Sequence, residues 1–300
     1  MVRHDPFGAA VGVVIDRLAG EPPMEPHPVA LLGRALSATE RVLYRDSRAA
    51  GVVHAATGAC VGAAAGAAVR STALATYVAV AGRALGDAAL AVEAALAGGD
   101  IERARLLIPA LVGRDPTAMD DKDMCRAAVE SVAENTVDAV VAPALWAAAL
   151  GAPGALGFRA VNTMDSMVGH RSPRYERYGW AAARLDDAAG FVPARVTAAL
   201  VAAVRPGEAV AVWRTVRRDA AAHPSPNAGV AESAFAAALG LRLGGENRYG
   251  DRVEVRPSLG DGSPPERADI ARAVRLANDV GLALAAGLAT VGLLQRWRRR

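Results

Sequence analysis

The chain has 300 residues, of which 52% are apolar and 4% aromatic, and its net charge at pH 7 is +3. This length allows one large domain or two small ones, and the weak charge without an internal basic tract excludes nucleic acid as an expected partner. Lys122 is the only lysine among 34 basic residues. Phosphate recognition must therefore fall to arginine, which binds phosphate oxygens in bidentate fashion. A genomic bias toward Ala and Arg codons would produce the same composition.

Two cysteines, Cys60 and Cys125, are too few for a disulfide framework and lack metal-ligand spacing. The N-terminal apolar run contains Asp16 and Arg17 and has no clear A-x-A site nearby. We therefore do not expect a cleaved signal peptide.

Six apolar segments follow one another along the chain, and nearly all of it is typical of helix. They are Phe7–Leu18, Val52–Val69, Thr72–Leu96, Val137–Val161, Val192–Val204 and Asp279–Leu294. A membrane span needs about 20 mainly apolar residues, and the second and last segments come closest. We expect an all-α, multi-pass helical integral membrane protein with roughly four to five spans, polar loops and amphipathic helices. A soluble all-helical protein is the alternative.

We expect a single membrane domain over residues 1–300, within which residues 205–278 are polar and loop-rich. In that segment Pro206–Ala222 predicts an amphipathic helix, and Asn227 is a candidate N-cap. A further helix is expected over Ala231–Leu239, ended by Gly240, with loops at the later glycine pairs.

Helix resumes at Glu266 and leads into the last apolar run, which is followed directly by Gln295–Arg300. A tryptophan beside clustered arginines is typical of a cytoplasmic membrane face. We therefore place Arg296–Arg300 on the cytoplasmic side.

Three carboxylates, Glu130, Glu134 and Asp138, are spaced at i, i+4 and i+8, which puts them on one face of a helix. They repel one another, and a divalent cation would remove that repulsion. A solvated acidic stripe is the alternative. The apolar sequence over residues 137–143 favours a magnesium site.

Two further motifs have plain structural alternatives. Asp186 and Asp187 follow Arg184, which could simply pair with Asp187 at i, i+3. Arg114, after Val112-Gly113, is either a phosphate ligand or part of a helix end before a turn. The sequence has no Walker A loop, no Gly-x-Gly-x-x-Gly, no His-Glu-x-x-His and no Gly-x-Ser-x-Gly motif.

Seven groups of residues together carry a family resemblance. In chain order they are Asp16…Gly20-Glu21-Pro22…His27-Pro28…Gly33-Arg34; Val112-Gly113-Arg114-Asp115; Glu130-Ser-Val-Ala-Glu134-Asn135-Thr136; Asn162-Thr-Met-Asp165-Ser166-Met167; Arg174-Tyr175…Gly179; Arg184-Leu-Asp186-Asp187…Pro193-Ala-Arg195; and Asp219…His223-Pro-Ser225-Pro-Asn227-Ala-Gly229…Leu243-Gly-Gly245. In order and spacing the chain resembles the adenosylcobinamide-phosphate synthases of cobalamin biosynthesis (CobD/CbiB). It departs from the pattern at Glu21, where the family has Asp, and at His170, a position associated with an aromatic residue.

The resemblance implies a multi-pass enzyme of the cytoplasmic (inner) membrane. Its expected reaction joins adenosylcobyric acid, through the f propionate, to (R)-1-aminopropan-2-ol or its O-phosphate, using ATP and Mg²⁺. Phosphorylation of the propionate is expected first, followed by amine attack on the acyl phosphate. Expected partners are these substrates, membrane lipid and, as candidates, other enzymes of the corrinoid pathway.

This chemistry needs acids, cations and a base, and the motif residues supply those types. As catalytic residues we expect Glu134, Asp187, Asp165 and Arg184. For substrate or phosphate binding we expect Arg114, Asn135, Asn162, Arg174, Arg195, Ser225 and Asn227. For metal binding we expect Glu130, Glu134, Asp138 and Asp187, the last converging from a second helix.

Two other functions would also suit such a chain. A transporter would bury charge in apolar helices but would show inverted repeats, which the sequence does not display. A soluble helical scaffold would be purified without detergent and would not respond to nucleotide.

Overall fold

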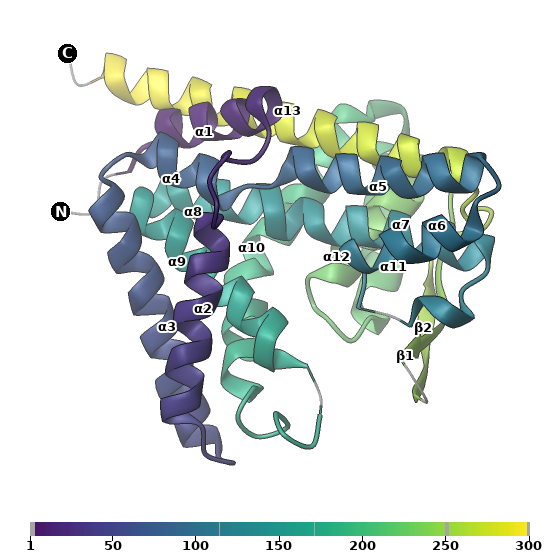
Figure 1. Cartoon of the computed structure of the whole chain (residues 1–300). Coiled ribbons are helices and arrows are strands. Elements are labelled where there is room, and N and C mark those ends of the chain that lie inside the picture. Colours follow the sequence, from purple (N-terminus) through teal and green to yellow (C-terminus); the bar gives the residue numbers. More distant parts are fainter. Residues whose placement is uncertain (1–3, 114, 171, 250–251, 299–300) are drawn as a thin grey trace. The chain divides into compact units, whose positions relative to one another are not determined.

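A computed structural model describes residues 4–113, 115–170, 172–249 and 252–298. In these residues the chain is helical apart from one two-stranded hairpin (Figure 1). The α-helices are α1 Pro6–Ala19, α2 Pro28–Leu43, α3 Arg48–Val69, α4 Thr72–Ala79, α5 Gly82–Ala97, α6 Ile101–Leu107, α7 Asp121–Thr136, α8 Ala142–Leu150, α9 Ala152–Met164, α10 Trp180–Val204, α11 Ala209–Asp219, α12 Ala228–Leu239 and α13 Arg267–Trp297.

The remaining elements are short. Four 3₁₀ turns occupy Ile108–Ala110 (η1), Pro116–Ala118 (η2), Pro206–Glu208 (η5) and Ala220–Ala222 (η6), and two π-helical segments occupy Val137–Val141 (η3) and Asp165–Gly169 (η4). The strands are β1 Leu243–Tyr249 and β2 Arg252–Leu259.

The chain divides into two compact units, and neither is a continuous piece of sequence. The first unit comprises Met1–Ala81, Asp138–Pro193 and Leu284–Arg300, and the second comprises Gly82–Val137 and Ala194–Ala283. The chain passes between them four times, and two of these crossings fall within the helices α10 and α13. The expectation of one domain over the whole chain stays a prediction.

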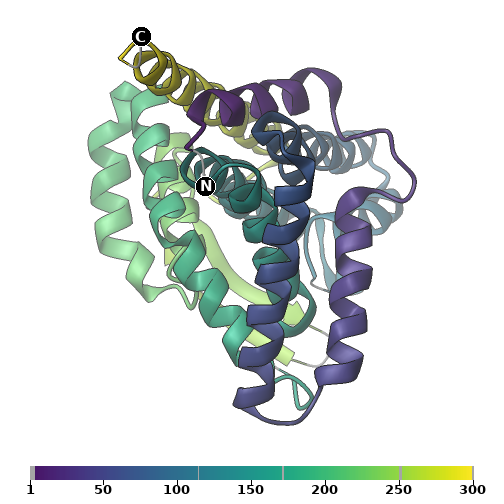
Figure 2. The same cartoon turned by 90° about the vertical axis from the view of Figure 1, so that its left-hand side faces the viewer.

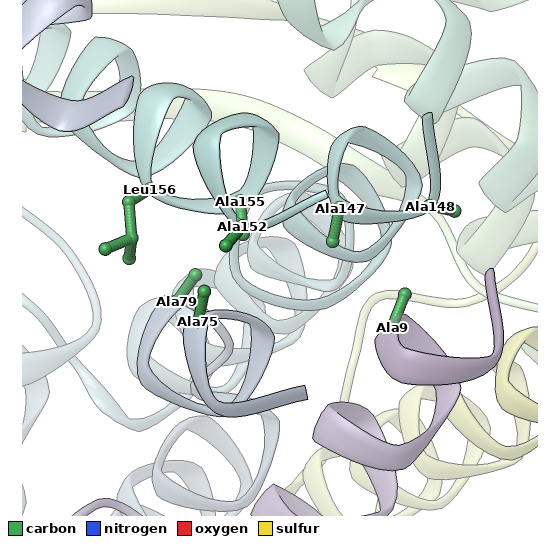
Figure 3. Packing of buried hydrophobic residues seen from close by; sticks show 8 residues of the cluster. All are labelled: Ala9, Ala75, Ala79, Ala147, Ala148, Ala152, Ala155 and Leu156. Atoms are coloured by element: carbon green, nitrogen blue, oxygen red, sulfur yellow. The ribbon is translucent and has the colours of Figure 1, made fainter. Parts of the chain in front are cut away.

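Alanine dominates the core of the first unit, as the scarcity of aromatic residues requires. One buried cluster consists of Ala9, Ala75, Ala79, Ala147, Ala148, Ala152, Ala155 and Leu156 (Figure 3). These residues come from α1, α4, α8 and α9. Small side chains at such a junction let four helices approach closely, which is how apolar helices pack where no large side chains fill the gaps.

Helices α3 and α9 of this unit pack closely, and glycine makes their approach possible. Gly58, Gly62 and Gly66 recur every four residues on the face of α3 that meets α9. A Cβ on Gly62 would lie 2.5 Å from the carbonyl oxygen of Leu156. The Gly-x-x-x-Gly spacing therefore brings the two backbones into contact.

Two other packings shape the first unit. Helix α2 runs beside α3, and α1 lies beside the C-terminal end of α13, as the view in Figure 2 also shows. Pro6 and Pro28 begin α1 and α2 at positions where the missing N–H costs nothing. The Asp5 side chain caps α1 by accepting from the Gly8 N–H at 2.9 Å.

In the second unit, α12 is the central helix and packs against α7 and α11. All its residues except Ala237 are buried. The β1–β2 hairpin packs on α11 and α12, with Gly245 opposite Arg256 and an irregularity between Leu243 and Gly245. Gly244 and Gly245 have positive φ, which glycine adopts without steric cost.

The prediction of an all-α protein with membrane-spanning helices is confirmed. In the described part of the chain three helices, α3, α10 and α13, have the length and apolarity of a span, against the four to five expected. The apolar segment Thr72–Leu96 forms two helices, of which α4 ends at Ala79 and α5 begins at Gly82. The apolar segment Val137–Val161 is likewise interrupted at Gly151, between α8 and α9. The resulting helices are too short to span a membrane.

The polar segment over residues 205–278 includes α11, α12 and the β1–β2 hairpin. The expected helices are present as α11 and α12, and α12 ends at Gly240 with φ 69° as predicted. The glycine pair expected to form a loop instead belongs to β1. Weak strand propensity in Leu243–Tyr249 hid this strand, because the strand is stabilised by its partner rather than by its own sequence.

Candidate functional site

Glu130 on α7 is buried in the second unit, with 3% of its surface exposed. Its Oε1 accepts a hydrogen bond of 2.8 Å from the Gly244 N–H. Arg126, one turn earlier, donates to the carbonyl oxygens of Gly244 and Glu246, the latter at 2.6 Å. These two side chains therefore fasten the start of β1 to α7.

Glu134 lies one turn after Glu130 and is exposed. Beside it, the Asn135 amide donates to the carbonyl oxygen of Ser131 at 3.0 Å, and the Ser131 hydroxyl donates to the carbonyl oxygen of Leu111 at 2.8 Å. Helix α7 thus offers one buried and one accessible carboxylate on the same face.

Asp138 departs from the spacing that the sequence implied. The α-helix ends at Thr136, and Asp138 lies in the π-helical segment η3, whose wider turn changes the direction of its side chain relative to an ideal α-helix. Glu130 and Glu134 belong to the second unit, whereas Asp138 and Asp187 belong to the first. The convergence of all four on one metal ion stays a prediction.

Both π-helical segments of the described chain contain an expected site residue. Asp138 lies in η3 and Asp165 in η4. Such segments are rare and frequent at functional sites, because they displace a side chain from the regular helical ladder. Their positions favour a functional role for the two aspartates, with the roles themselves untested.

Three of the expected binding residues come together at the N-terminus of α12. Arg195 NH1 donates to Asn227 Oδ1 at 3.3 Å, and the Ser225 hydroxyl oxygen accepts from the N–H groups of Asn227 and Ala228 at 3.3 and 3.2 Å. The predicted cap is therefore corrected. Asn227 occupies the N-cap position but makes no capping bond with its side chain, whose amide oxygen accepts from Arg195. The Gly229 N–H bonds instead to the carbonyl oxygen of Ser225.

His223, Glu232 and Arg256 form a buried polar cluster that sequence reasoning missed. His223 Nε2 lies 3.7 Å from Glu232 Oε1 and 3.2 Å from Arg256 NH1, and the His and Glu side chains are 6% and 8% exposed. Arg256 also contacts Glu254 at 3.0 Å. Pro224 and Pro226 follow His223, a pattern typical of a surface turn, yet Glu232 of α12 and Arg256 of β2 contact its ring.

Both ring nitrogens of His223 have polar neighbours. Nε2 lies 3.2 Å from Arg256 NH1 and 3.7 Å from Glu232 Oε1. Nδ1 accepts from the Ser225 N–H at 3.1 Å and lies 3.2 Å from the Ser225 carbonyl oxygen. An imidazole nitrogen beside a carboxylate and a guanidinium is placed for proton transfer.

A second polar group lies in the first unit around Arg159, which the sequence analysis also missed. Arg159 donates through Nε to the carbonyl oxygen of Ala79 at 2.8 Å and through NH1 to Asn162 Oδ1 at 3.4 Å. The Asn162 amide in turn donates to Asp186 at 3.4 Å. Burial lowers the pKa of the Arg159 guanidinium, and the charge of Asp138 is the strongest of the opposing influences. This arginine joins α4, α9 and α10.

The two remaining described arginines among the expected site residues have carboxylate partners. Arg174 lies 3.3 Å from Glu40 and 4.1 Å from the centre of the Tyr44 ring, a combination of ion pair and cation–π contact. Arg184 pairs with Asp187 at 3.4 Å, the structural alternative raised for that motif. Arg114 lies outside the described residues.

No group of three His, Cys, Asp or Glu side chains in the described residues is placed to hold a metal ion. Glu130 is buried and already accepts from Gly244, so Glu134 is the accessible carboxylate of this pair. This donor set fits Mg²⁺ that arrives on phosphate oxygens, since that ion is commonly bound through one or two carboxylates. It does not form a metal centre built by protein ligands alone.

These features define a helical protein that has helices long and apolar enough to span a membrane and that buries ionisable side chains. Comparison with known proteins gives the family. Residues 9–277 match the family described as CobD/Cbib protein. Proteins named Cobalamin biosynthesis protein CobD are 49% identical in Mycobacterium tuberculosis (strain H37Rv), over 98% of this chain and 96% of the relative, and 39% identical in Geobacter metallireducens, over 86% and 88%. No solved structure matches the chain.

The chain therefore belongs to the CobD/CbiB family of cobalamin biosynthesis. The family resemblance drawn from the sequence motifs is confirmed.

Proposed function

We propose that the protein catalyses ATP-dependent formation of the amide between the f propionate of adenosylcobyric acid and (R)-1-aminopropan-2-ol or its O-phosphate. The observation that carries this proposal is the buried cluster of His223, Glu232 and Arg256, together with the Arg195–Asn227 contact at the N-terminus of α12. It brings a base, a carboxylate and two guanidinium groups to one helix end.

The proposed reaction has two steps. A propionate oxygen attacks the γ-phosphorus of ATP, which forms an acyl phosphate and releases ADP. The amine nitrogen then attacks the acyl carbon, the C–O bond to phosphate breaks, and inorganic phosphate leaves. Magnesium, when bound with the nucleotide, neutralises charge on the phosphates.

We assign the protein's contributions to its own residues. Arg195 and Arg256 stabilise negative charge on the phosphoryl group, since arginine binds phosphate oxygens in a fixed fork. His223 Nε2 accepts the proton that the attacking amine loses, and Glu232 stabilises the resulting imidazolium. Glu134 lies on the accessible face of α7 and contributes a carboxylate toward the nucleotide-bound magnesium.

We further propose that the protein resides in the cytoplasmic (inner) membrane. The apolar helices α3, α10 and α13 and the exposed Trp297 before the final arginines support this location. The arginines from Arg296 onward would face the cytoplasm, where ATP is present. A C-terminal reporter that is active only on the outer face would contradict this orientation.

The variant His223→Gln tests the proposed base. Glutamine keeps the hydrogen-bonding capacity but cannot accept a proton at neutral pH, so turnover should fall by about 10²-fold or more. The decline of turnover on the acidic side of the pH–rate profile should also disappear in this variant. His170→Gln is the matched control, because His170 is exposed and its ring makes an edge-to-face contact with Tyr175.

Unchanged turnover and an unchanged pH profile in a folded His223→Gln protein would remove His223 from the reaction. Circular dichroism in detergent would establish that both variants keep their helical content.

A further inference from the structure

A wide cavity of about 840 Å³ opens in the first unit, and none of the site residues described above lines it. It lies where α1, α4 and α9 begin and where α3, α8 and α13 end, so six helix ends meet around it. Its polar lining consists of His4, Asp5, Arg70, Ser71, Thr72, Gln295 and Arg296.

Positive charge predominates in this lining. Arg70 and Arg296 carry full charges. The partial charges of the helix ends offset one another, because three helices begin here and three end here. The one carboxylate among the lining residues, Asp5, is engaged in capping the Gly8 N–H. Arg296 is held in place over the Phe7 ring, 4.3 Å from its centre. The cavity therefore suits an anionic group.

Arg70 has an unusual backbone conformation for its type. It follows the last residue of α3 with φ 58°, a left-handed conformation that helices usually give to glycine at this position. It is the one non-glycine residue with positive φ in the described ranges. The chain has 30 glycines and yet keeps an arginine here. Strain retained at such a position points to a use for the side chain.

Large apolar side chains surround the cavity. Leu150 forms part of its wall, and Leu74, Leu293 and Leu294 are 49%, 54% and 53% exposed on the helices that border it. Trp297 is 76% exposed one residue beyond Arg296. A basic interior with an apolar border matches a molecule that has an anionic head and hydrocarbon chains. A soluble phosphate would leave that border unused.

We propose that this cavity binds the phosphate of an anionic phospholipid headgroup, with Arg70 and Arg296 as its cationic ligands. The acyl chains then lie along the exposed leucines of α4 and α13. This site goes beyond the proposed function and requires none of the residues assigned to it.

Lipid exchange on the purified full-length protein tests this proposal. The protein in detergent is offered phosphatidylglycerol or phosphatidylcholine, and bound lipid is counted by native mass spectrometry. We expect phosphatidylglycerol to be retained at least fivefold more than phosphatidylcholine. That preference should vanish in the double variant Arg70→Gly/Arg296→Gln and persist in Arg214→Gln, a control in which an exposed arginine of α11 is changed.

Thermal unfolding of Arg70→Gly separates a ligand role from a structural one. Glycine suits the left-handed conformation, so the variant should unfold at a higher temperature without lipid while losing its response to phosphatidylglycerol. Equal retention of both lipids by the wild type, or the same preference in the double variant, would overturn the proposal. Stabilisation by free glycerol 3-phosphate equal to that by the lipid would assign the site to a soluble phosphate ester and would also overturn it.

Discussion

Replacing Gly66 with alanine should destabilise the first unit because the new methyl group has no space. A Cβ at this position would lie 2.6 Å from the carbonyl carbon of Ala152 and 2.8 Å from the Cα of Pro153. Both are backbone atoms of α9 and cannot rotate away. Relief of the clash therefore requires the two helices to separate, which also weakens the neighbouring contact at Gly62.

The magnitude follows from two opposing effects. Alanine is about 1 kcal/mol more favourable than glycine inside a helix, whereas overpacking against a rigid neighbour costs about 3 kcal/mol at the upper end of the usual range. The net change for Gly66→Ala is a loss of about 2 kcal/mol in the free energy of unfolding.

Gly157→Ala is the matched control on the same interface. The nearest atoms to a Cβ on Gly157 are the Cβ and N of Ala63, at 3.7 and 3.8 Å, which is ordinary contact. This variant should gain about 1 kcal/mol from helix propensity. The two variants thus differ by about 3 kcal/mol, or roughly 6 °C in thermal midpoint at about 2 °C per kcal/mol.

The assay is thermal unfolding of the two purified variants and the wild type in one detergent, followed by circular dichroism. The expected order of midpoints is Gly157→Ala, wild type, Gly66→Ala. A Gly66→Ala midpoint equal to or above that of the wild type would show that α3 and α9 do not approach as closely as described.

Three further outcomes follow from the site and its surroundings. Burial raises the pKa of the Cys125 thiol to about 12, so at pH 8 about one molecule in ten thousand is thiolate; in the variant Cys60→Ser a maleimide should label the protein only after unfolding. The hydrogen bond from Arg218 lowers the pKa of the Asp219 carboxyl below its ordinary 3.8, so its stabilising contribution should be complete above about pH 4 and lost as the pH falls through the lowered value. The thermal midpoint of Asp219→Asn should accordingly depend less on pH between 5 and 3, and an identical pH dependence would contradict this. Arg184→Lys keeps the charge but loses the guanidinium fork proposed to bind phosphate, so turnover should fall at least tenfold, about 1.4 kcal/mol in the barrier. Wild-type turnover in this variant would show that Arg184 serves only as the ion-pair partner of Asp187.

Local sequence patterns predicted the helices because helix formation depends on neighbours within a few turns. The helix ended by Gly240 was found with its correct end, since the apolar run and the glycine are both local signals. Strand β1 was missed because its sequence, LGGENRY, has weak strand propensity. Its pairing with β2 supplies what the sequence lacks.

The candidate site shows the same division between local and distant information. The i, i+4 spacing correctly placed Glu130 and Glu134 one turn apart on α7, but burial of Glu130 depends on the N–H of Gly244, 114 residues away. The prolines that follow His223 favour a surface turn over a catalytic role. Its ring is buried through contacts with Glu232 and Arg256, and no pattern near His223 reveals those partners.

Formation of the amide can be measured directly on the wild-type protein. The purified protein in detergent is incubated with adenosylcobyric acid, (R)-1-aminopropan-2-ol or its O-phosphate, and Mg-ATP, and the corrinoid is analysed by mass spectrometry while phosphate release is followed. We expect a corrinoid heavier by the amine less one water, formed only with ATP and in step with phosphate release. Unaltered corrinoid with both amines, in a preparation that is folded, would contradict it.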